Sequence, residues 1–434
     1  MLARRAGRTH RRRPDRGGLR RHRFQGAGRG AEARHAGDNR RHAGGRVEVE
    51  AYKIEARGIE IERREIGRLV GEEPGPTVVI VAGIHGNEPA GTEAARRVFA
   101  RLSRGDLRIR GELVAFAGNL AGLRLGVRYQ AKDLNRVWSE AHIAALREKR
   151  SSEHDPEDRE QLELLAAIES ALGRARGRVH LVDLHTTSAA GIPFVLFGDT
   201  LAQRRFARAF PLPVIIGLEE QLDAVLTEYW TRRGCTTLAI EGGQHASPDS
   251  TDAIEAFLWF ALVRAGLLEG HAPTEVARSA ALLDQRRAGL PRVVEVISRR
   301  SVSPEDGFRM EPGFRNIDRA RKGQLLARDQ NGEIRAPADG MVLLPLYQGL
   351  GRDGFFWGRE VSGARLLASE ALRAIGAERL LGILPGMARD PRDPSRFVVD
   401  ARSARPLTLK LLHLFGYRRV REDGSRLIVE RQQP

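Results

Sequence analysis

The stretch that most constrains the fold runs from residue 77 to residue 91 and reads TVVIVAGIHGNEPAG. Its first six residues, Thr77 to Ala82, form an unbroken run of β-branched and apolar side chains, which is typical of a strand buried on both faces of a parallel sheet. Gly83, His85 and Glu88 follow at once. Open α/β sheets keep their functional sites at the carboxyl ends of their strands. The stretch therefore predicts a central strand with candidate metal ligands at its end.

A second apolar strand ends in another candidate ligand. Residues 179–188 read VHLVDLHTTS, and the apolar part of this run stops at His185. A catalytic zinc usually takes three protein ligands and leaves one position for water, so His85, Glu88 and His185 form the predicted ligand set. Each histidine could instead be an ordinary hydrogen-bonded residue at a strand end. Two strand ends with histidines, one followed by a glutamate, favour the metal site.

Apolar runs with strand and helix periodicity alternate through the first two thirds of the chain, and this alternation predicts a three-layer α/β domain. A shorter alternating segment at 47–68 predicts one or two strands leading into the sheet. The charges of a helix at 156–172 are expected to face solvent. The expected strands are 77–82, 112–117, 179–185, 194–197, 214–217 and 236–240, and the expected helices are 89–104, 156–172, 201–209, 222–233 and 251–268.

The net charge of +16 is concentrated at the amino terminus, where residues 1–46 hold 15 arginines and three acids. This stretch has too few apolar residues to offset chain entropy, so we expect it to be disordered. It could bind nucleic-acid phosphates by charge, although it lacks interleaved aromatic residues for base stacking. It could equally be an over-extended gene start, with the true start near Val47. Cys235 is the only cysteine, which fits a reducing cytoplasm, and no apolar run is long enough to span a membrane.

Four short motifs, in one order along the chain, resemble the succinylglutamate desuccinylase and aspartoacylase family, a branch of the zinc carboxypeptidase-like hydrolases. They are GIHGNE at 83–88, DLNR at 133–136, DLH at 183–185 and IEGG at 240–243. The resemblance covers roughly residues 50–360. It implies a three-layer α/β/α domain with a mixed sheet, a smaller C-terminal β-rich domain over the mouth of the site, and one zinc ion per chain held by His85, Glu88 and His185.

The resemblance also assigns roles around the metal. Glu241 matches the general base, although a carboxylate here could also cap a helix or form a salt bridge. Arg128 matches the arginine that stabilises the oxyanion, and Asn135 and Arg136 match the pair that binds the substrate carboxylate. Either arginine could instead be a surface residue in so arginine-rich a chain.

Other matches are looser. Tyr229 and Arg233 resemble a second substrate-anchoring pair, but the alignment there needs a gap. Asp183 could orient a zinc-bound histidine or only cap its strand, and His245 could reach the cleft or lie in the core or on the surface. His180 points to the opposite face from Asp183. A substrate-binding tyrosine of aspartoacylase is replaced by phenylalanine within GRDGFFWG, at position 355 or 356, which weakens an N-acetylaspartate assignment.

The composition changes near residue 290, where short alternating runs are separated by glycine and proline. We therefore expect four parts: a disordered tail at 1–46, a hydrolase domain at 47–289, a β-rich capping domain at 290–360 and an α+β extension at 361–434. Within the extension, residues 407–414 predict a helix and residues 417–431 a hairpin.

The predicted activity is that of a cytoplasmic zinc amidohydrolase that deacylates a small N-acyl amino acid. The alternatives are a zinc carboxypeptidase on short peptides, a metal-binding but inactive scaffold, and, in another class, a nucleic-acid-binding protein that acts through the arginine-rich arm. Nucleic acid and membrane are not expected partners. The acyl group, the amino acid and the oligomeric state are left open by the sequence.

Overall fold

The computed structural model describes residues 63–268, 273–287, 289–348, 350–391, 393, 395–400, 406–423 and 426–431. The predicted arm at 1–46 and most of the predicted strand region at 47–68 lie outside these residues. Residues 51–434 group as one compact unit, and the domain limits near residues 290 and 361 remain predictions.

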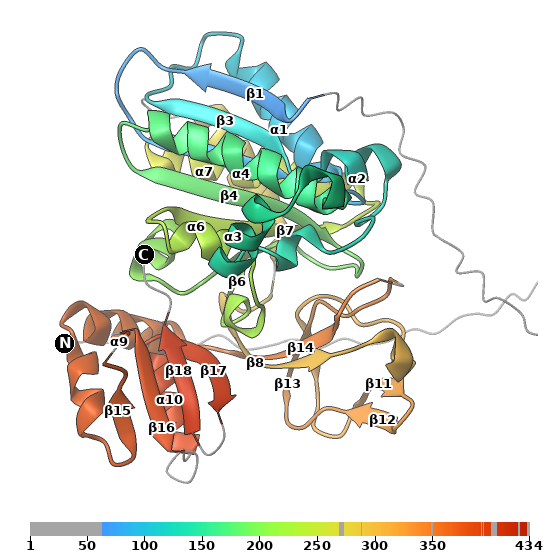
Figure 1. The fold of residues 1–434 in the computed structure, drawn as a ribbon, viewed down its shortest axis with the longest axis vertical. Coiled ribbons are helices and arrows are strands. Elements are labelled where there is room, and N and C mark those ends of the chain that lie inside the picture. Colours follow the sequence, from blue (N-terminus) through green and yellow to red (C-terminus); the bar gives the residue numbers. More distant parts are fainter. Residues whose placement is uncertain are drawn as a thin grey trace, which may run out of the picture. The chain divides into compact units, whose positions relative to one another are not determined.

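A large mixed sheet organises the part of the chain that the structure describes (Figure 1). The central strand β2 is fully buried and lies parallel to a neighbour on each side, β3 and β4. Antiparallel pairs, β1 with β3 and β5 with β7, make the sheet mixed. Across the sheet the order is β1 (Glu65–Val70), β3 (Glu112–Ala117), β2 (Thr77–Ala82), β4 (Val179–Thr187), β7 (Thr236–Gln244), β5 (Phe194–Phe197), β6 (Val214–Ile216), β8 (Val293–Ser301), β14 (Asp353–Glu360), β13 (Gly340–Leu343) and β10 (Asp318–Ala320).

Helices cover both faces of this sheet, which explains why β2 carries apolar side chains on both of its faces. Val78 and Ile80 pack into one core and Val79 and Val81 into another, because successive side chains of a strand point to opposite faces. The predicted three-layer α/β/α fold with a mixed sheet is thus confirmed. The first core contains α1 (Ala90–Leu102), α5 (Leu201–Ala207), α7 (Pro248–Ala265) and α8 (Pro273–Arg287), and the second contains α3 (Glu140–Glu148), α4 (Pro156–Arg174) and α6 (Leu226–Thr231).

The acidic first turns of α4 correct one expectation, since its charges were expected to face solvent. Glu157 and Glu160 are buried. Glu157 accepts backbone N–H groups from Gln130 and Ala131 at 2.8 and 2.9 Å, and Glu160 accepts that of Leu120 at 2.8 Å. Buried charges persist where such hydrogen bonds satisfy them. These carboxylates therefore hold α2 (Leu120–Leu125) and the long loop that follows it, which carries several candidate site residues.

One predicted helix begins later than expected, and one long helix was not expected from the sequence. α6 starts at Leu226 instead of 222, because residues 219–221 form the short turn η3 (Glu219–Gln221) and Leu222 is extended. α8 was not predicted at all. Its charged sequence has little hydrophobic contrast between its faces, and it packs on α7 through few side chains, including Leu283.

The C-terminal third adds two small sheets. The predicted helix at 407–414 and the hairpin at 417–431 are confirmed as α10, β17 and β18, although the hairpin's turn falls partly outside the described residues. One sheet holds β9 (Arg309–Met310), β11 (Leu325–Asp329) and β12 (Gly332–Arg335); the other holds β15 (Met387–Arg389), β16 (Arg396–Asp400), β17 (Tyr417–Asp423) and β18 (Arg426–Arg431), with α9 (Gly363–Ala374) and α10 (Pro406–Leu414) nearby in sequence. Short turns complete the chain at η1 (Leu134–Arg136), η2 (Ser151–Glu153), η4 (Pro304–Asp306) and η5 (Ala377–Ile383).

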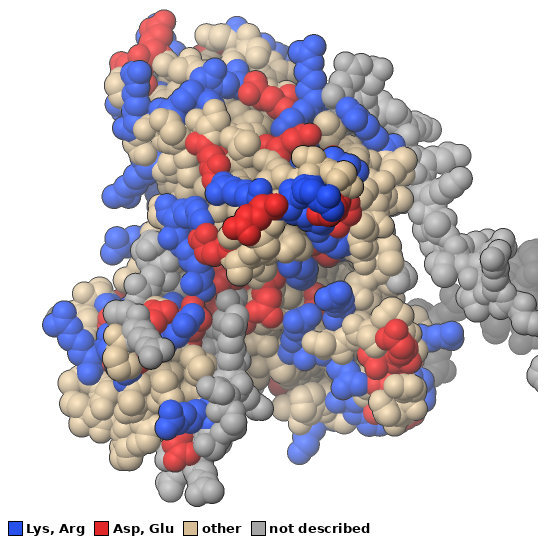
Figure 2. Space-filling view, in the orientation of Figure 1, with Lys and Arg blue, Asp and Glu red and all other residues tan. Residues whose placement is uncertain are grey.

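Basic and acidic side chains are interspersed on the face drawn in Figure 2, rather than gathered by sign. This agrees with the small excess of basic residues after residue 46. Among the helices that the structure describes, none has both the length and the apolar character needed to cross a bilayer.

Candidate metal centre

The turn between β2 and α1 carries His85 and Glu88, and a close backbone approach fixes its position. A Cβ atom on Gly86 would lie 2.0 Å from the carbonyl carbon of Gly122, so no side chain fits there. The Gly86 N–H donates to the carbonyl oxygen of Arg128 at 3.1 Å. The turn is therefore packed directly against the segment that carries Arg128.

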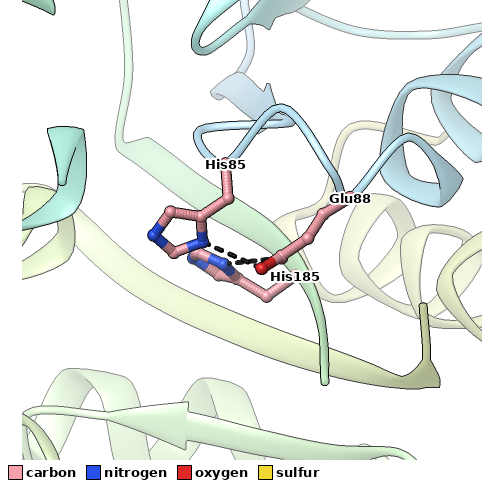
Figure 3. Close-up of side chains that lie close together, drawn as sticks. All are labelled: His85, Glu88 and His185. Atoms are coloured by element: carbon pink, nitrogen blue, oxygen red, sulfur yellow. Dashed lines mark hydrogen bonds and ion pairs between the residues drawn. The ribbon is translucent and has the colours of Figure 1, made fainter. Parts of the chain in front are cut away.

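The three predicted ligands meet at one point (Figure 3). The Nδ1 atom of His85 lies 2.9 Å from Oε1 of Glu88, and the Nδ1 atom of His185 lies 3.2 Å from Oε2. One ligand atom from each residue falls within 4.8 Å of the others, and all three side chains are buried. Imidazole nitrogens and a carboxylate are donors that zinc accepts in catalytic sites. The donor set and its convergence fit a divalent metal ion.

Each histidine turns its other ring nitrogen to an aspartate. The Nε2 atom of His185 lies 2.8 Å from Asp183, and that of His85 lies 3.1 Å from Asp133. Such partners fix the orientation and the tautomer of metal-binding histidines. Asp183 was considered for this position from the sequence. Asp133 was noted only as the first residue of the DLNR motif, and a polar loop gives no local sign of which histidine it reaches.

The charged forms of this cluster stabilise one another. Burial favours neutral Glu88, but His85 and His185 outweigh it and hold the pKa of Glu88 well below its usual value. Burial likewise opposes protonated His185, yet the charge of Asp183 and its hydrogen bond raise the pKa of that imidazole well above its usual range. The opposite charges of Glu88 and His185 therefore favour each other, and a metal ion that binds this imidazole would displace its proton.

Glu241 lies beside this cluster on β7, in register with His185 on the neighbouring strand β4. Its side chain is buried, and its Oε2 atom has no hydrogen-bond partner among the described residues. Burial, reinforced by the charges of Glu88 and Asp183, raises its pKa to about 8. A carboxyl group is suited to taking up and releasing a proton when its pKa is close to neutral pH and one of its oxygens makes no hydrogen bond.

Arg128 lies among the ligands rather than apart from them. Its Nη2 atom donates to Asp133 at 3.0 Å and lies 2.9 Å from Nε2 of His85, and its Nη1 atom donates to Glu88 at 3.3 Å. This guanidinium therefore borders both the candidate metal position and the cavity in front of it.

Asn135 and Arg136 also line the cavity, and both make contacts within the protein. The Oδ1 atom of Asn135 accepts the N–H of Leu226 at 2.9 Å, which fixes its amide. Arg136 donates through Nη1 to the carbonyl oxygen of Asn135 at 2.9 Å and through Nη2 to Asp353 at 3.0 Å.

Tyr229 and Arg233 are not among the residues that line the cavity. Tyr229 is buried in the core beside Trp138, and the Arg233 guanidinium lies 3.5 Å from the centre of the Tyr229 ring. Arg233 also forms an ion pair with Glu140 at 2.6 Å. The structure thus gives this pair a packing role at and just after α6 and does not bring it to the cavity.

A cavity of about 290 Å³ opens in front of the metal cluster and reveals residues that the sequence left undecided. His245 lines it, with its Nδ1 atom 2.8 Å from the hydroxyl of Thr186. Phe356 also lines it, whereas Phe355 packs in a separate core with β11 and β13. Glu219 and Asp353 are further lining residues that no sequence motif indicated. His180, by contrast, is buried against Phe206 on the other face of β4, as expected.

The fold and these side chains define an α/β protein with a candidate metal centre at the carboxyl edge of its sheet. Residues 74–257 match the model of the succinylglutamate desuccinylase/aspartoacylase catalytic domain. This part of the chain is therefore similar to the catalytic domain of that family of hydrolases.

Its relatives include the succinylglutamate desuccinylase of Burkholderia thailandensis, which is 28% identical over 263 residues, or 58% of this chain and 70% of that protein. The succinylglutamate desuccinylase of Burkholderia pseudomallei is 36% identical over 119 residues, which cover 27% of this chain and only 32% of that relative. Among solved structures, the ectoine utilization protein EutE of Ruegeria pomeroyi superposes with a TM-score of 0.49 at 21% identity, over 67% of this chain and 87% of the other. A succinylglutamate desuccinylase/aspartoacylase from Rhodobacter sphaeroides superposes with a TM-score of 0.48 at 18% identity, over 68% and 88% of the two chains.

Proposed function

We propose that this chain is a cytoplasmic, zinc-dependent amidohydrolase that removes the acyl group from a small N-acyl amino acid. The observation that carries the proposal is the convergence of two imidazoles and a carboxylate beside Glu241, at the base of a cavity large enough for a small substrate. The similarity of residues 74–257 to the catalytic domain of a hydrolase family supports the reaction class. His85, Glu88 and His185 would hold one zinc ion per chain.

Zinc, when bound in such a site, supplies a water of lowered pKa and polarises a carbonyl oxygen. Glu241 takes the proton of the attacking water and delivers it to the leaving nitrogen. Its raised pKa suits both steps, because a group that titrates near the working pH can accept and then donate a proton.

The two arginines, Arg128 and Arg136, have different roles in the proposed reaction. Arg128, next to the ligands, stabilises the negative charge that develops on the carbonyl oxygen, a contribution typically worth about 10²-fold or more in rate. Arg136 and the amide of Asn135 hold the substrate carboxylate. Asp133 and Asp183 keep both histidines oriented.

Elemental analysis of the purified protein, combined with a hydrolysis screen, tests the proposal. About one zinc per chain, and release of free acid from N-acetyl or N-succinyl amino acids, support it. Glu241→Gln serves as the matched inactive control, since it preserves the shape of the side chain and removes its basicity. Release of only the C-terminal residues of peptides would assign the carboxypeptidase activity instead, and activity that survives Glu241→Gln would contradict the mechanism.

A further inference from the structure

The basic residues that line the cavity are mostly committed to carboxylates of the protein. Arg128 is bonded to Glu88 and Asp133, and Lys132 lies 2.9 Å from Asp155. Arg136 is bonded to Asp353. Arg352 is exposed to solvent. Apart from the candidate metal position and the exposed Arg352, these basic side chains of the cavity are therefore already paired with acids of the protein.

The ion pair of Asp353 is the clearest example of this pairing, because its partner is Arg136, the arginine proposed to bind the substrate. Its Oδ2 atom accepts from Nη2 of Arg136 at 3.0 Å, and its other oxygen accepts from Arg299. Arg299 in turn donates to the carbonyl oxygen of Gln221 at 3.0 Å. Asp353 is thus held between two arginines, one at each carboxylate oxygen, at the first position of β14.

The wall around this point is apolar, with one more acid. Glu219 is buried and accepts the hydroxyl of Thr227 at 2.7 Å. A carboxylate placed against such a wall would lose its hydration without gaining a cation, which is costly. An aliphatic or aromatic group placed there would gain free energy by leaving water. The apolar lining residues are Leu196, Leu218, Leu222, Val225, Ala239 and Phe356.

From these contacts we propose that the cavity selects N-acyl amino acids with a single carboxylate and an apolar group, and that Asp353 sets this selection against polyanions. The inference rests on the proposed function and narrows its substrate class. A single substrate carboxylate binds the N–H groups of Arg136 that do not donate to Asp353. Additional carboxylates would lie against Asp353, Glu219 and the apolar wall, where they would be repelled or lose their hydration.

Equilibrium binding to a zinc-loaded protein that cannot turn over tests the selection directly. In the Glu241→Gln background, isothermal titration calorimetry would compare N-acetyl-L-leucine, with one carboxylate, and N-succinyl-L-glutamate, with three. We expect N-acetyl-L-leucine to bind at least about tenfold more tightly. Adding Asp353→Asn should strengthen the binding of N-succinyl-L-glutamate about tenfold and change that of N-acetyl-L-leucine by much less.

Two further variants separate a change in substrate selection from a general loss of stability or binding. Glu219→Gln removes the second acid of the wall and should shift the same ratio in the same direction, so the test survives if Asp353→Asn does not fold. Asp252→Asn makes the same chemical change in an exposed ion pair with Arg97 and should leave the ratio unchanged.

The inference is overturned if N-succinyl-L-glutamate binds as tightly as N-acetyl-L-leucine, if neither binds, or if the foldable cavity variants leave the ratio unchanged. Failure of the proposed function has a different signature. In that case the wild-type protein hydrolyses neither compound, whatever the ratio of their affinities in the Glu241→Gln background.

Discussion

Two buried clusters of charge in this protein have opposite characters. One is the candidate metal centre with Glu241. The other, which we call the Asp199 network, consists of Asp199, Arg204, Glu295, Arg373 and Arg418, and it joins α5 and β8 to α9 and β17. Both are inside the protein, and both mix acids with bases. Only the metal centre opens into the large cavity.

The carboxylates of the two clusters differ in how they are paired. Arg204 and Arg418 donate to Asp199 at 2.9 and 2.8 Å, and Arg418 also reaches Glu295. Burial would raise the pKa of Asp199, but its arginines outweigh burial and lower that pKa. Glu241 has no such partner at its Oε2 atom, and its pKa rises to about 8. The contrast indicates that paired acids hold this fold together, while an unpaired acid at a cavity is available for chemistry.

The largest expected effect tests the unpaired acid. Glu241→Gln should lower the rate of hydrolysis by about 10²- to 10⁴-fold, because proton transfer by a positioned group contributes that much. The unfolding midpoint should not fall, since the amide removes a group whose charged form is disfavoured by burial. Steady-state kinetics with zinc content and thermal unfolding measure both quantities. A stable variant with undiminished activity would show that Glu241 is catalytically idle.

The next effect tests the paired acid. Asp199→Ala should lower the free energy of unfolding by about 3 to 5 kcal/mol, because it leaves buried arginines without a counter-charge. Chemical denaturation measures this change. Asp252→Ala, in an exposed ion pair with Arg97, is the control and should cost less than about 1 kcal/mol. Equal costs for the two variants would remove the distinction between the buried and the exposed pair.

The same variant has a pH dependence of known sign. Because the folded pKa of Asp199 is lowered, its stabilising contribution is fully present above its unfolded pKa and is lost as pH falls through the folded value. The difference between wild type and Asp199→Ala should therefore shrink only in strong acid. A difference that shrinks near neutral pH would point to another titrating group.

Metal binding should produce a smaller change in stability that depends on concentration. Zinc at about 100 times its dissociation constant should stabilise the folded protein by about 2.7 kcal/mol, because the ligands converge only in the folded state. Thermal unfolding with zinc and with a chelator measures the shift. His185→Ala should abolish it, whereas Asp199→Ala should retain it. A full zinc shift in His185→Ala would place the metal elsewhere.

The smallest expected effect tests whether a buried titratable group needs access to the cavity to be functional, or only the lack of a hydrogen-bond partner. His180 is buried with an unpartnered Nδ1 atom, and burial, aided by Arg178, lowers its pKa to about 4. The unfolded chain binds the proton first, so stability should fall by about 2 kcal/mol between pH 6.5 and pH 5. His180→Leu should remove this part of the acid slope and leave the rate of hydrolysis within about twofold. A large loss of activity in His180→Leu would mean that a buried group without a hydrogen-bond partner can be functional even where it does not line the cavity.

The sequence alone predicted the central strands, which the structure confirms, and the candidate ligand set. Runs such as Thr77 to Ala82 are local signals of a strand buried on both faces, and the strand ends must meet at one edge of a parallel sheet. His85, Glu88 and His185 could therefore be brought together before any coordinates were known. The family resemblance of the IEGG motif pointed to Glu241, which the structure places in register with His185.

Only the tertiary structure decided which charges pair with each other. Arg136 meets Asp353 across 217 residues, and Asp199 meets Arg418 across 219. The acids in the first turns of α4 are buried, while Tyr229 and Arg233 pack away from the cavity. No periodicity encodes such partners, because a salt bridge depends on which side chains two distant elements present to each other. Local sequence patterns determine the helices and strands and where they end, whereas tertiary packing determines which charged side chains form ion pairs.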